Sequence, residues 1–479
     1  MPIKSDSLTA QPLLPKWRIF SIVAAGVFMS TLDSSMVNIA LPTIMEEFNS
    51  SLRATEWIVL VYLLTITSTL LIWGTLSDRL GRNRIYPLGL IVFAFGSLAC
   101  AFAPKLSFLI VSRLCQALGA GMMMSTGPAI IKDTFPENQL GRGRGMISVF
   151  VSLGLMTGPA LGGFLLEYFS WRALFFITVP IGFLFALAGL ILIPERDPDQ
   201  YQKNSPPLSS RWKGPATWIL LLISFSLAIS YASAPSWSPL VLSALGLTVA
   251  LALTLFIFHE KKAANPLLPY DLVKNRFFLS ALICASLSFL ILFFVLILTP
   301  FYLSHVLNMP KARIGSIMMT IPLAVLLIGP TAGWLSEKFT AQKLSTLGLL
   351  FSSLGVALLA GLSEHSSPSG IIARLAVLGG GQALFLAPNS ASILKNVTRQ
   401  HTGKSASLLA TARNLGMLLG IAMASLVFSH KFSQLTGGLD LRDFSAEHTS
   451  AFVEAMRQSF FVAALIGVLG VFISWNRDG

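Results

Sequence analysis

Asp33 is the residue of this sequence best suited to proton chemistry, because it lies within an apolar run that begins near Phe20. An isolated ionised carboxylate near the centre of a bilayer costs several kcal/mol, so the group must be protonated, paired or in contact with water. Arg113, in another apolar run, is the obvious partner. The rise of a helix places Asp33 about 12 Å and Arg113 about 8 Å below the same end of the bundle.

A pair of this kind can bind and release a proton. Burial disfavours the charged carboxyl and the guanidinium favours it, so water that enters from one side can change its protonation. The alternative is a permanent ion pair that only holds two helices together. Intramembrane ionisable groups are functional by default, which favours the first interpretation.

Arg413 is another intramembrane cation, about 12 Å from the nearer end of its expected helix. No acidic residue lies within any expected helix of the second half of the chain. Arg413 either lines a cavity or anchors its helix through backbone carbonyl groups, and the sequence leaves both interpretations open.

Six further polar residues within apolar runs are candidates for the wall of a cavity. Each could equally make a hydrogen bond between helices, worth about 0.6 kcal/mol. The candidates are Asn38, Tyr62, Gln116, Gln382, Asn389 and Asn414.

The segment "GTLSDRLGRNR", which begins at Gly74, combines glycines with charges of both signs. Gly74 and Gly81 permit tight turns. Asp78 lies beside Arg79 and near Arg82, so this segment can exchange charged partners. Positive-inside topology alone explains the arginines, but it does not explain the spacing of the glycines and the aspartate.

Gly154, Gly158 and Gly162 recur every four residues and give one helix a smooth face for a close neighbour. Gly163 follows directly, and Pro159 adds a kink within the same stretch. From the residues alone, this segment is a packing device.

The elements that must position these residues are membrane helices. Hydrophobic residues make up 54% of the 479 positions and charged residues 11%, whereas a soluble chain carries charge at about a quarter of its positions. Apolar runs of about 18 to 24 residues, long enough to cross a bilayer, recur throughout. They predict helices over 19–41, 57–74, 85–103, 108–131, 145–164, 171–193, 216–233, 237–258, 277–303, 314–334, 344–362, 371–394, 405–428 and 459–475.

Two polar stretches divide the fourteen predicted helices. Residues 195–215 are rich in proline, serine and charge, which predicts a cytoplasmic linker, and residues 259–276 close a two-helix insert. We therefore expect a six-helix bundle over 1–194, linkers and the insert over 195–276, and a second six-helix bundle over 277–479.

The two predicted bundles repeat each other weakly at an offset of about 260 residues. Chance similarity between apolar helices is a poor explanation, because polar residues and glycines carry the match. Repeats of this type are typical of transporters whose two bundles move around a site at the midplane of the membrane. The matched positions are Gly74 with Gly333, Arg113 with Arg374, Pro128 with Pro388, and Gly154 with Gly416.

The net charge of +13 does not indicate nucleic-acid binding, because no soluble basic segment is long enough to form such a domain. Most of the 34 lysines and arginines lie in short loops on one side, and the positive-inside rule places both termini in the cytoplasm. The sequence has neither a GxxxxGK[ST] loop nor a GxSxG elbow, and its histidines and cysteines lack ligand spacing. We therefore expect no enzyme, metal site or cofactor.

Six motifs resemble those of the major facilitator superfamily, and within it the branch of fourteen-helix drug:proton antiporters. The resemblance covers essentially the whole chain and implies an all-α membrane protein with the major facilitator fold, two six-helix bundles plus two inserted helices. The motifs are "LDSSMVNIALP" from Leu32, "GTLSDRLGRNR" from Gly74, "RLCQALGAG" from Arg113, "GLMTGPALGG" from Gly154, "WRALFFITVPIG" from Trp171 and "ARNLG" from Ala412.

The resemblance also implies roles for individual residues. Asp33 would bind the proton and contact the substrate, and Arg113 would regulate it. The stretch from Gly154 to Gly163 would be the antiporter signature of the fifth helix.

The same resemblance implies a gate at the cytoplasmic side. Asp78 would meet a helix N-terminus of the other bundle near Ser405, where the helix dipole favours an anion. Arg79 or Arg82 would pair with Asp133 at the end of the fourth helix. Both contacts would stabilise an outward-facing state.

Together, these features predict a proton-coupled secondary active exporter, of the multidrug efflux type, for lipophilic toxic molecules that are cationic or neutral. Its partners would be the substrate, protons and membrane lipid, with the proton gradient as the energy source. Asp33 is the only carboxylate within the expected helices, so one proton per substrate is the simplest stoichiometry. We expect a monomer in a bacterial cytoplasmic (inner) membrane. The alternatives are a lipid or glycolipid flippase and a non-transporting scaffold or receptor.

Overall fold

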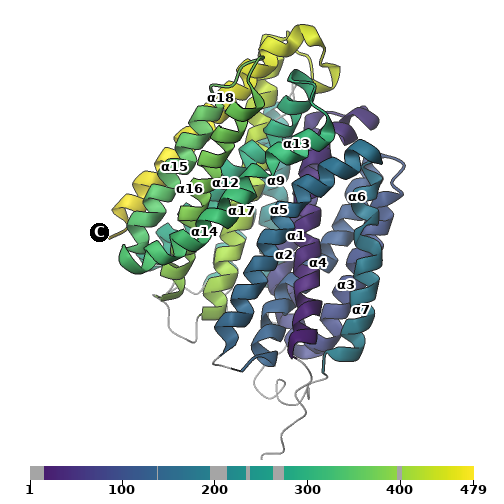
Figure 1. Ribbon diagram of the computed structural model, residues 1–479, viewed down its shortest axis with the longest axis vertical. Helices are drawn as coiled ribbons and strands as arrows, with labels where there is room; N and C mark the ends of the chain where they lie inside the picture. Colours follow the sequence, from purple (N-terminus) through teal and green to yellow (C-terminus); the bar gives the residue numbers. More distant parts are fainter. Residues whose placement is uncertain are drawn as a thin grey trace, which may run out of the picture.

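The computed structural model of the protein describes residues 16–136, 139–194, 213–232, 238–262, 274–395 and 402–478. Within these ranges the chain is helical and contains no β-strand. Figure 1 shows two inclined groups of helices that lie side by side. Thirteen helical segments of the described chain are long and apolar enough to cross a membrane. A further long helix, α2 (Leu52–Leu80), packs against α4 and α17, which are among those thirteen. The predicted all-α membrane fold is confirmed.

The first six spans form the N bundle. Its last span consists of two helices, because Ile177 between them keeps helical dihedral angles (φ −62°, ψ −29°). Besides α2, the elements are α1 (Lys16–Glu47), α3 (Arg82–Ala101), α4 (Leu106–Thr134), α5 (Leu140–Tyr168), α6 (Arg172–Phe176) and α7 (Thr178–Leu192).

The last six spans form the C bundle. Its first span ends in a short π-helix, η3, and its second consists of α13 and α14, joined at Met319 with helical angles (φ −63°, ψ −17°). The elements are α12 (Arg276–Phe301), η3 (Tyr302–Val306), α13 (Lys311–Met318), α14 (Thr320–Lys338), α15 (Ala341–Leu359), α16 (Pro368–Lys395), α17 (Thr402–Leu435), η5 (Leu441–Asp443), η6 (Ala446–His448), α18 (Thr449–Trp475) and η7 (Asn476–Asp478).

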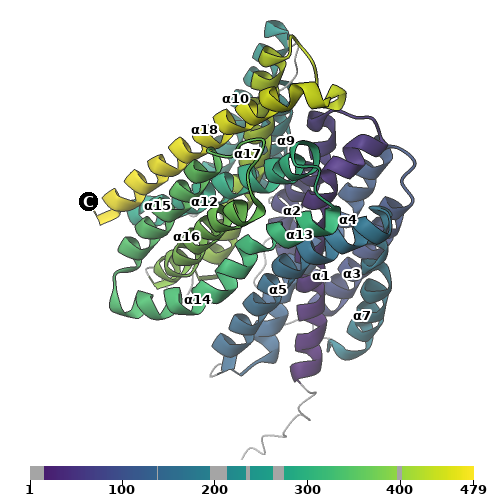
Figure 2. The same ribbon diagram turned by 45° about the horizontal axis from the view of Figure 1, so that its top comes forward.

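Two inserted helices, α9 (Lys213–Ala232) and α10 (Pro239–Lys262), lie at one flank of the bundles, beside α17 in Figure 2. α9 packs against α2 of the N bundle and against α17 of the C bundle. Trp57 of α2 donates a hydrogen bond from Nε1 to Ser230 Oγ of α9 at 2.9 Å. α10 packs on α9, where the ring centroids of Trp218 and Phe256 are 5.3 Å apart.

The internal repeat is visible in the packing of helix pairs. Gly96 of α3 lies against the backbone of Gln116 on α4 so closely that a Cβ atom would clash. Gly355 of α15 lies in the same way against Leu378 on α16, with a Cβ position 2.6 Å from the Leu378 nitrogen. The repeat offset of about 260 residues relates these two glycines, so both bundles use the same device for close packing.

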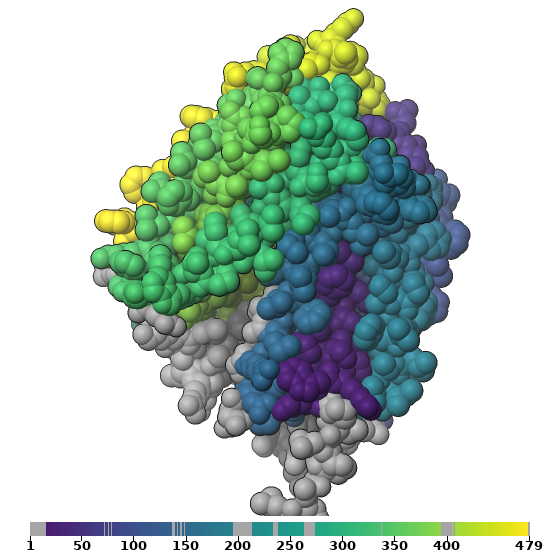
Figure 3. All heavy atoms as spheres, in the orientation of Figure 1, coloured from purple at the N-terminus to yellow at the C-terminus, as the bar shows by residue number. Residues whose placement is uncertain are grey.

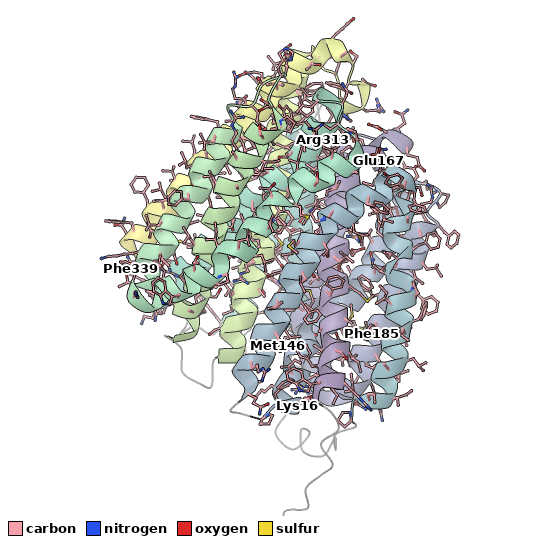
Figure 4. All side chains as sticks on the ribbon, in the orientation of Figure 1. Lys16, Met146, Glu167, Phe185, Arg313 and Phe339 are labelled. Carbon is pink, nitrogen blue, oxygen red and sulfur yellow. The ribbon has the colours of Figure 1, made fainter. Side chains whose placement is uncertain are left out.

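Among the described residues, the close contact of α5 with α13 joins the two bundles at one end. We call the end with Glu167 and Arg313 the outer end, and the opposite end with Lys16 the inner end (Figure 4). In Figure 3 the blue and green atoms meet along the upper part of the molecule, where α5 packs on α13. Near the inner end, a Cβ atom at Gly74 or Gly333 would meet no atom of the described residues within 4 Å. The described structure is therefore closed at the outer end.

Candidate functional site

Asp33 and Arg113 form a buried ion pair between α1 and α4. Arg113 Nη1 donates to Asp33 Oδ2 at 2.5 Å, and the exposed fraction of either residue is at most 1%. Gln116, one turn further along α4, donates from Nε2 to Asp33 Oδ1 at 2.9 Å. The pairing that the sequence predicts is present, and we call these three residues the Asp33 cluster.

Two other helices of the N bundle also hold this cluster. Arg113 Nε donates to the Ile58 carbonyl oxygen of α2 at 3.1 Å, and Nη1 also donates to Gln116 Oε1 at 2.6 Å. Gln116 Nε2 donates to Ser97 Oγ of α3 at 2.7 Å. The guanidinium carbon lies 4.1 Å from the ring centroid of Tyr62 on α2. Four helices thus fix the position of one carboxylate.

The chemistry of the Asp33 cluster follows from its donors and acceptors. Arg113 Nη2 has no hydrogen-bond acceptor among the described residues. A guanidinium keeps its charge at any physiological pH, whereas a carboxylate can take up a proton. A proton on Asp33 would remove most of its attraction for Arg113 and leave the guanidinium free to bind water or a substrate. The cluster therefore combines one ionisable acid, one permanent cation and one spare donor.

Glycines of α5 fix the part of α1 that carries Asp33. A Cβ atom at Gly154 would clash with Thr31, and one at Gly158 would clash with Ser35. Ser35 Oγ also donates to the Gly154 carbonyl oxygen at 3.3 Å. Because these contacts lie on either side of Asp33 in the sequence of α1, they hold the carboxylate in place.

Gly162 also faces α1, whereas Gly163 lies on the other side of α5 and faces the C bundle. A Cβ atom at Gly163 would lie 2.7 Å from the Lys311 carbonyl oxygen and 2.9 Å from Gly315 Cα on α13. The carbonyl oxygen of Pro159 approaches Gly315 in the same contact. The segment that resembles the antiporter signature therefore contacts both the Asp33 helix and the opposite bundle.

Two polar candidates of the C bundle are used in packing. Gln382 accepts a hydrogen bond from Ser288 Oγ at 2.9 Å and donates to the Ser288 carbonyl oxygen at 3.1 Å. Asn389 donates to the Ala281 carbonyl oxygen at 3.2 Å and accepts from Arg477 Nη2 at 2.9 Å. Neither residue contacts the Asp33 cluster through these bonds.

Arg413 lies on α17, where Nη2 donates to Ser390 Oγ of α16 at 2.7 Å. Its guanidinium carbon is 5.6 Å from the ring centroid of Phe289, and Nε has no acceptor among the described residues. Asn414 follows and is partly exposed. Asn38, on the Asp33 helix, is 4% exposed, and its Oδ1 has no donor in the described part of the chain.

The predicted turn at Gly74 is wrong. α2 continues to Leu80, so Gly74 lies inside a helix, because the helix extends beyond the apolar run that marks its membrane part. The turn lies at Gly81, whose positive φ of 93° favours glycine. Arg82, directly after it, forms an ion pair with Asp133 at the end of α4. The expected partner of Asp133 is therefore present.

The other residues of the predicted gate are placed only in part. The side chain of Asp78 lies outside the described residues, so its contact near Ser405 stays a prediction. Ser405 Oγ is buried and has no hydrogen-bond partner in the described ranges. Arg79 lies in the last turn of α2 and is partly buried.

Asp33 is not the only buried acid, contrary to the sequence-based expectation. Glu56 of α2 has an exposed fraction of 0%. The expected second helix began at residue 57, but Ser51 caps the observed helix by accepting the backbone N–H of Ala54 at 3.2 Å. A serine followed by a helix-compatible stretch is an N-cap signal that would have placed Glu56 inside the helix.

The fold and the buried cluster define a membrane transporter, and comparison with known proteins agrees. The family model described as "Major Facilitator Superfamily" matches residues 23–259 and 278–477, so the chain belongs to this superfamily. The protein is therefore a transporter and not an enzyme.

Among curated relatives, the chain is 35% identical to the riboflavin transporter RibZ of Clostridioides difficile (strain 630), over 96% of this chain and 97% of that protein. It is 27% identical to the multidrug resistance protein Stp of Mycobacterium tuberculosis (strain CDC 1551 / Oshkosh), over 86% of this chain and 76% of that protein. Among solved structures, a bacterial homolog of the human lysosomal transporter Spinster, inward-facing and unoccupied, has a TM-score of 0.70 at 15% identity. That match covers 98% of this chain and 97% of the other, and it shows the fold alone.

Proposed function

We propose that the protein is a proton-coupled antiporter that exports lipophilic small molecules, cationic or neutral, across a bacterial cytoplasmic membrane. The observation that supports this most directly is the Asp33 cluster, in which a 1% exposed acid lies against a permanent cation. An intramembrane ionisable residue is by default a candidate for a proton or ion pathway. The proton gradient would supply the energy.

In the proposed cycle, Asp33 is neutral during one half and paired with Arg113 during the other. When the outer end is open, external water reaches Asp33 and a proton neutralises it. When the inner end is open, the proton leaves to the cytoplasm and a substrate binds from the same side. Because the charged and neutral forms favour different conformations, proton and substrate movements are coupled.

The stoichiometry depends on the number of acids that titrate during transport. Since Glu56 is a second buried acid, one proton per substrate is no longer the simplest stoichiometry. Exchange of one proton for a monovalent cation moves no net charge. Exchange for a neutral molecule moves one charge, which couples transport to the membrane potential by about 2.3 kcal/mol per 100 mV.

Purified protein in liposomes with an imposed pH gradient tests this proposal, with a fluorescent cationic dye as substrate. We expect Asp33→Asn to abolish gradient-driven dye movement and to leave the thermal unfolding midpoint within a few degrees of the wild type. Glu447→Gln is the matched control, because Glu447 is an exposed acid of η6. Undiminished gradient-driven transport by Asp33→Asn would contradict the proposal.

Riboflavin, or a similar planar molecule rich in hydrogen-bond acceptors, is a second candidate substrate. The relative from Clostridioides difficile is described as a riboflavin transporter. Arg413 also supports such a substrate, because its Nε lacks an acceptor and a nearby guanidinium disfavours a cationic substrate. Phe289 beside it offers an aromatic surface for stacking.

Radiolabelled riboflavin in the same liposomes separates the two candidates. If riboflavin is transported, Arg413→Gln should lower its rate more than it lowers the rate for a cationic dye. Saturable riboflavin transport with no dye movement favours the second candidate, and dye movement without riboflavin transport favours the first.

A further inference from the structure

Glu56 is a buried acid with no hydrogen-bond partner. Its exposed fraction is 0%, and neither carboxyl oxygen makes a hydrogen bond with any described residue. Its neighbours Leu52, Thr55 and Val59 are also at most 1% exposed. An ionised carboxylate in such a site would lose its hydration without compensation, so the packed arrangement requires the protonated form.

Glu56 lies at the boundary between the two bundles. α2, which carries it, packs against α17 of the C bundle. The hydroxyl of Ser425 on α17 faces the carboxyl. Ser425 is itself 0% exposed, and its Oγ also lacks a hydrogen bond of ordinary geometry to any described residue. Any movement that opens the outer end must change this contact, because the two residues belong to different bundles.

The charged groups around Glu56 do not supply a close counter-ion. Arg53, one turn earlier on α2, acts on the carboxyl at longer range. From α4, Arg113 contacts α2 at the Ile58 carbonyl oxygen and at the Tyr62 ring, and its Nη1 is used by the Asp33 cluster. On α1, Glu46 and Glu47 lie at the outer end, where Glu47 pairs with Arg172, and Asp33 lies deeper in the bundle.

The inserted helix adds few titratable groups, and the outer loops carry further ones. α9 contacts the next residue, Trp57, through Ser230, and its ionisable side chains in the described range are Lys213 at the opposite end of the helix and Tyr231. Elsewhere at the outer end, His305 Nδ1 lies 3.7 Å from Glu46 Oε1, and His365 and His448 lie in the outer loops.

We infer that Glu56 is a second proton-binding site, which holds a proton while the outer ends of α2 and α17 are packed together and exchanges it with external water when they separate. The inference deepens the proposed proton coupling and rests on it for its role in transport. Ionised Glu56 favours hydration and therefore the open outer end. Protonated Glu56 favours the closed outer end, so acid outside stabilises the closed form.

This site is connected to the Asp33 cluster through α2. Ile58, two residues after Glu56, accepts the hydrogen bond from Arg113 Nε at 3.1 Å. A displacement of the first turns of α2 would therefore move a partner of Arg113. The proton at Glu56 and the proton at Asp33 can thus influence each other without direct contact between the two acids.

The distance between the outer ends of the two bundles tests the inference without any transport measurement. Spin labels are attached at Lys105→Cys in the loop before α4 and at His365→Cys in the loop before α16. The exposed Cys115 is first replaced by serine. All variants also carry Asp33→Asn, so that the other buried acid cannot titrate. Distance distributions are recorded between about pH 5 and about pH 8.

The reference protein is the spin-labelled chain with Cys115→Ser and Asp33→Asn and no other change. We expect the distance between its two labels to shift from short to long as the pH rises. Glu56→Gln should lose this shift and keep the short distance throughout, whereas Glu56→Asp should retain a shift. Glu447→Gln and His305→Gln should titrate like the reference. A Glu56→Gln protein that titrates unchanged, or a shift that disappears in His305→Gln instead, would overturn the inference. Because the Asp33→Asn background does not require transport, this result is independent of the test of the proposed function.

Discussion

Glu167 on α5 caps the first turn of α13, with its Oε2 accepting the backbone N–H of Lys311 at 2.7 Å. The N–H of Ala312 approaches the same oxygen at 3.4 Å. Pro310, the residue that precedes α13, supplies no side-chain cap. The helix dipole favours an anion at this position. Because the acid and the capped helix belong to different bundles, this contact stabilises the closed outer end.

Removal of this cap should open the outer end. We expect Glu167→Gln to raise the free energy of the closed form relative to the open form by about 1 kcal/mol, a factor of about five in population. Distance measurements between the outer loops of the two bundles would detect the change. Glu447→Gln serves as the control. An unchanged distance distribution in Glu167→Gln would show that the cap does not contribute to closure.

A side chain at Gly158 should destabilise the N bundle, because its Cβ would clash with Ser35. We expect Gly158→Val to reduce stability by about 1 to 3 kcal/mol, as overpacking typically does. Gly246→Val in α10 is the matched control, since a Cβ atom at Gly246 meets nothing within 4 Å. Thermal unfolding in detergent distinguishes the two variants, and equal midpoints would contradict this prediction.

Gly163→Ala should act on conformation more than on stability. The added methyl group would lie 2.7 Å from the Lys311 carbonyl oxygen in the opposite bundle, so the closed outer end must loosen. We expect a larger open population, with an unfolding midpoint closer to the wild type than that of Gly158→Val. Cysteine accessibility to a membrane-impermeant reagent at the outer loops measures the open population. The prediction fails if accessibility stays at the wild-type level.

Gln116→Ala should move the pH dependence of transport. Gln116 donates a hydrogen bond to Asp33 Oδ1 at 2.9 Å, and this bond stabilises the charged carboxylate. Without this bond the charged form loses a donor, so half-maximal gradient-driven transport should move to higher pH. Gln382→Ala is the matched control, because Gln382 bonds to Ser288 within the C bundle. Identical pH profiles for the two variants would argue against a role for Gln116.

Much of the architecture could be predicted because lipid imposes a simple rule on sequence. A helix that crosses the bilayer needs a long apolar run, and polar residues inside such runs need partners. These two rules place the helices and predict the Asp33–Arg113 pair. They do not place helix ends outside the bilayer, which explains the wrong turn at Gly74.

The rest of the site depends on contacts between distant segments. Glu56 was missed because the apolar run starts one residue later, although Ser51 signals an earlier helix start. The second role of Gly163 could not be predicted from its spacing, because its neighbour Gly315 lies in the other bundle. Which side of a glycine-rich helix meets which partner is a property of the assembled fold.

The position of α9 makes the two flanks of the molecule unequal. On one flank α9 covers the boundary between α2 and α17, and on the other flank α5 meets α13 and α14 with no further described helix packed over them. Lipid tails therefore contact α9 at the boundary between α2 and α17, whereas they contact α5, α13 and α14 directly at the other boundary. A molecule that reaches the bundle boundary from the lipid would thus meet α9 on one flank and α5, α13 and α14 themselves on the other.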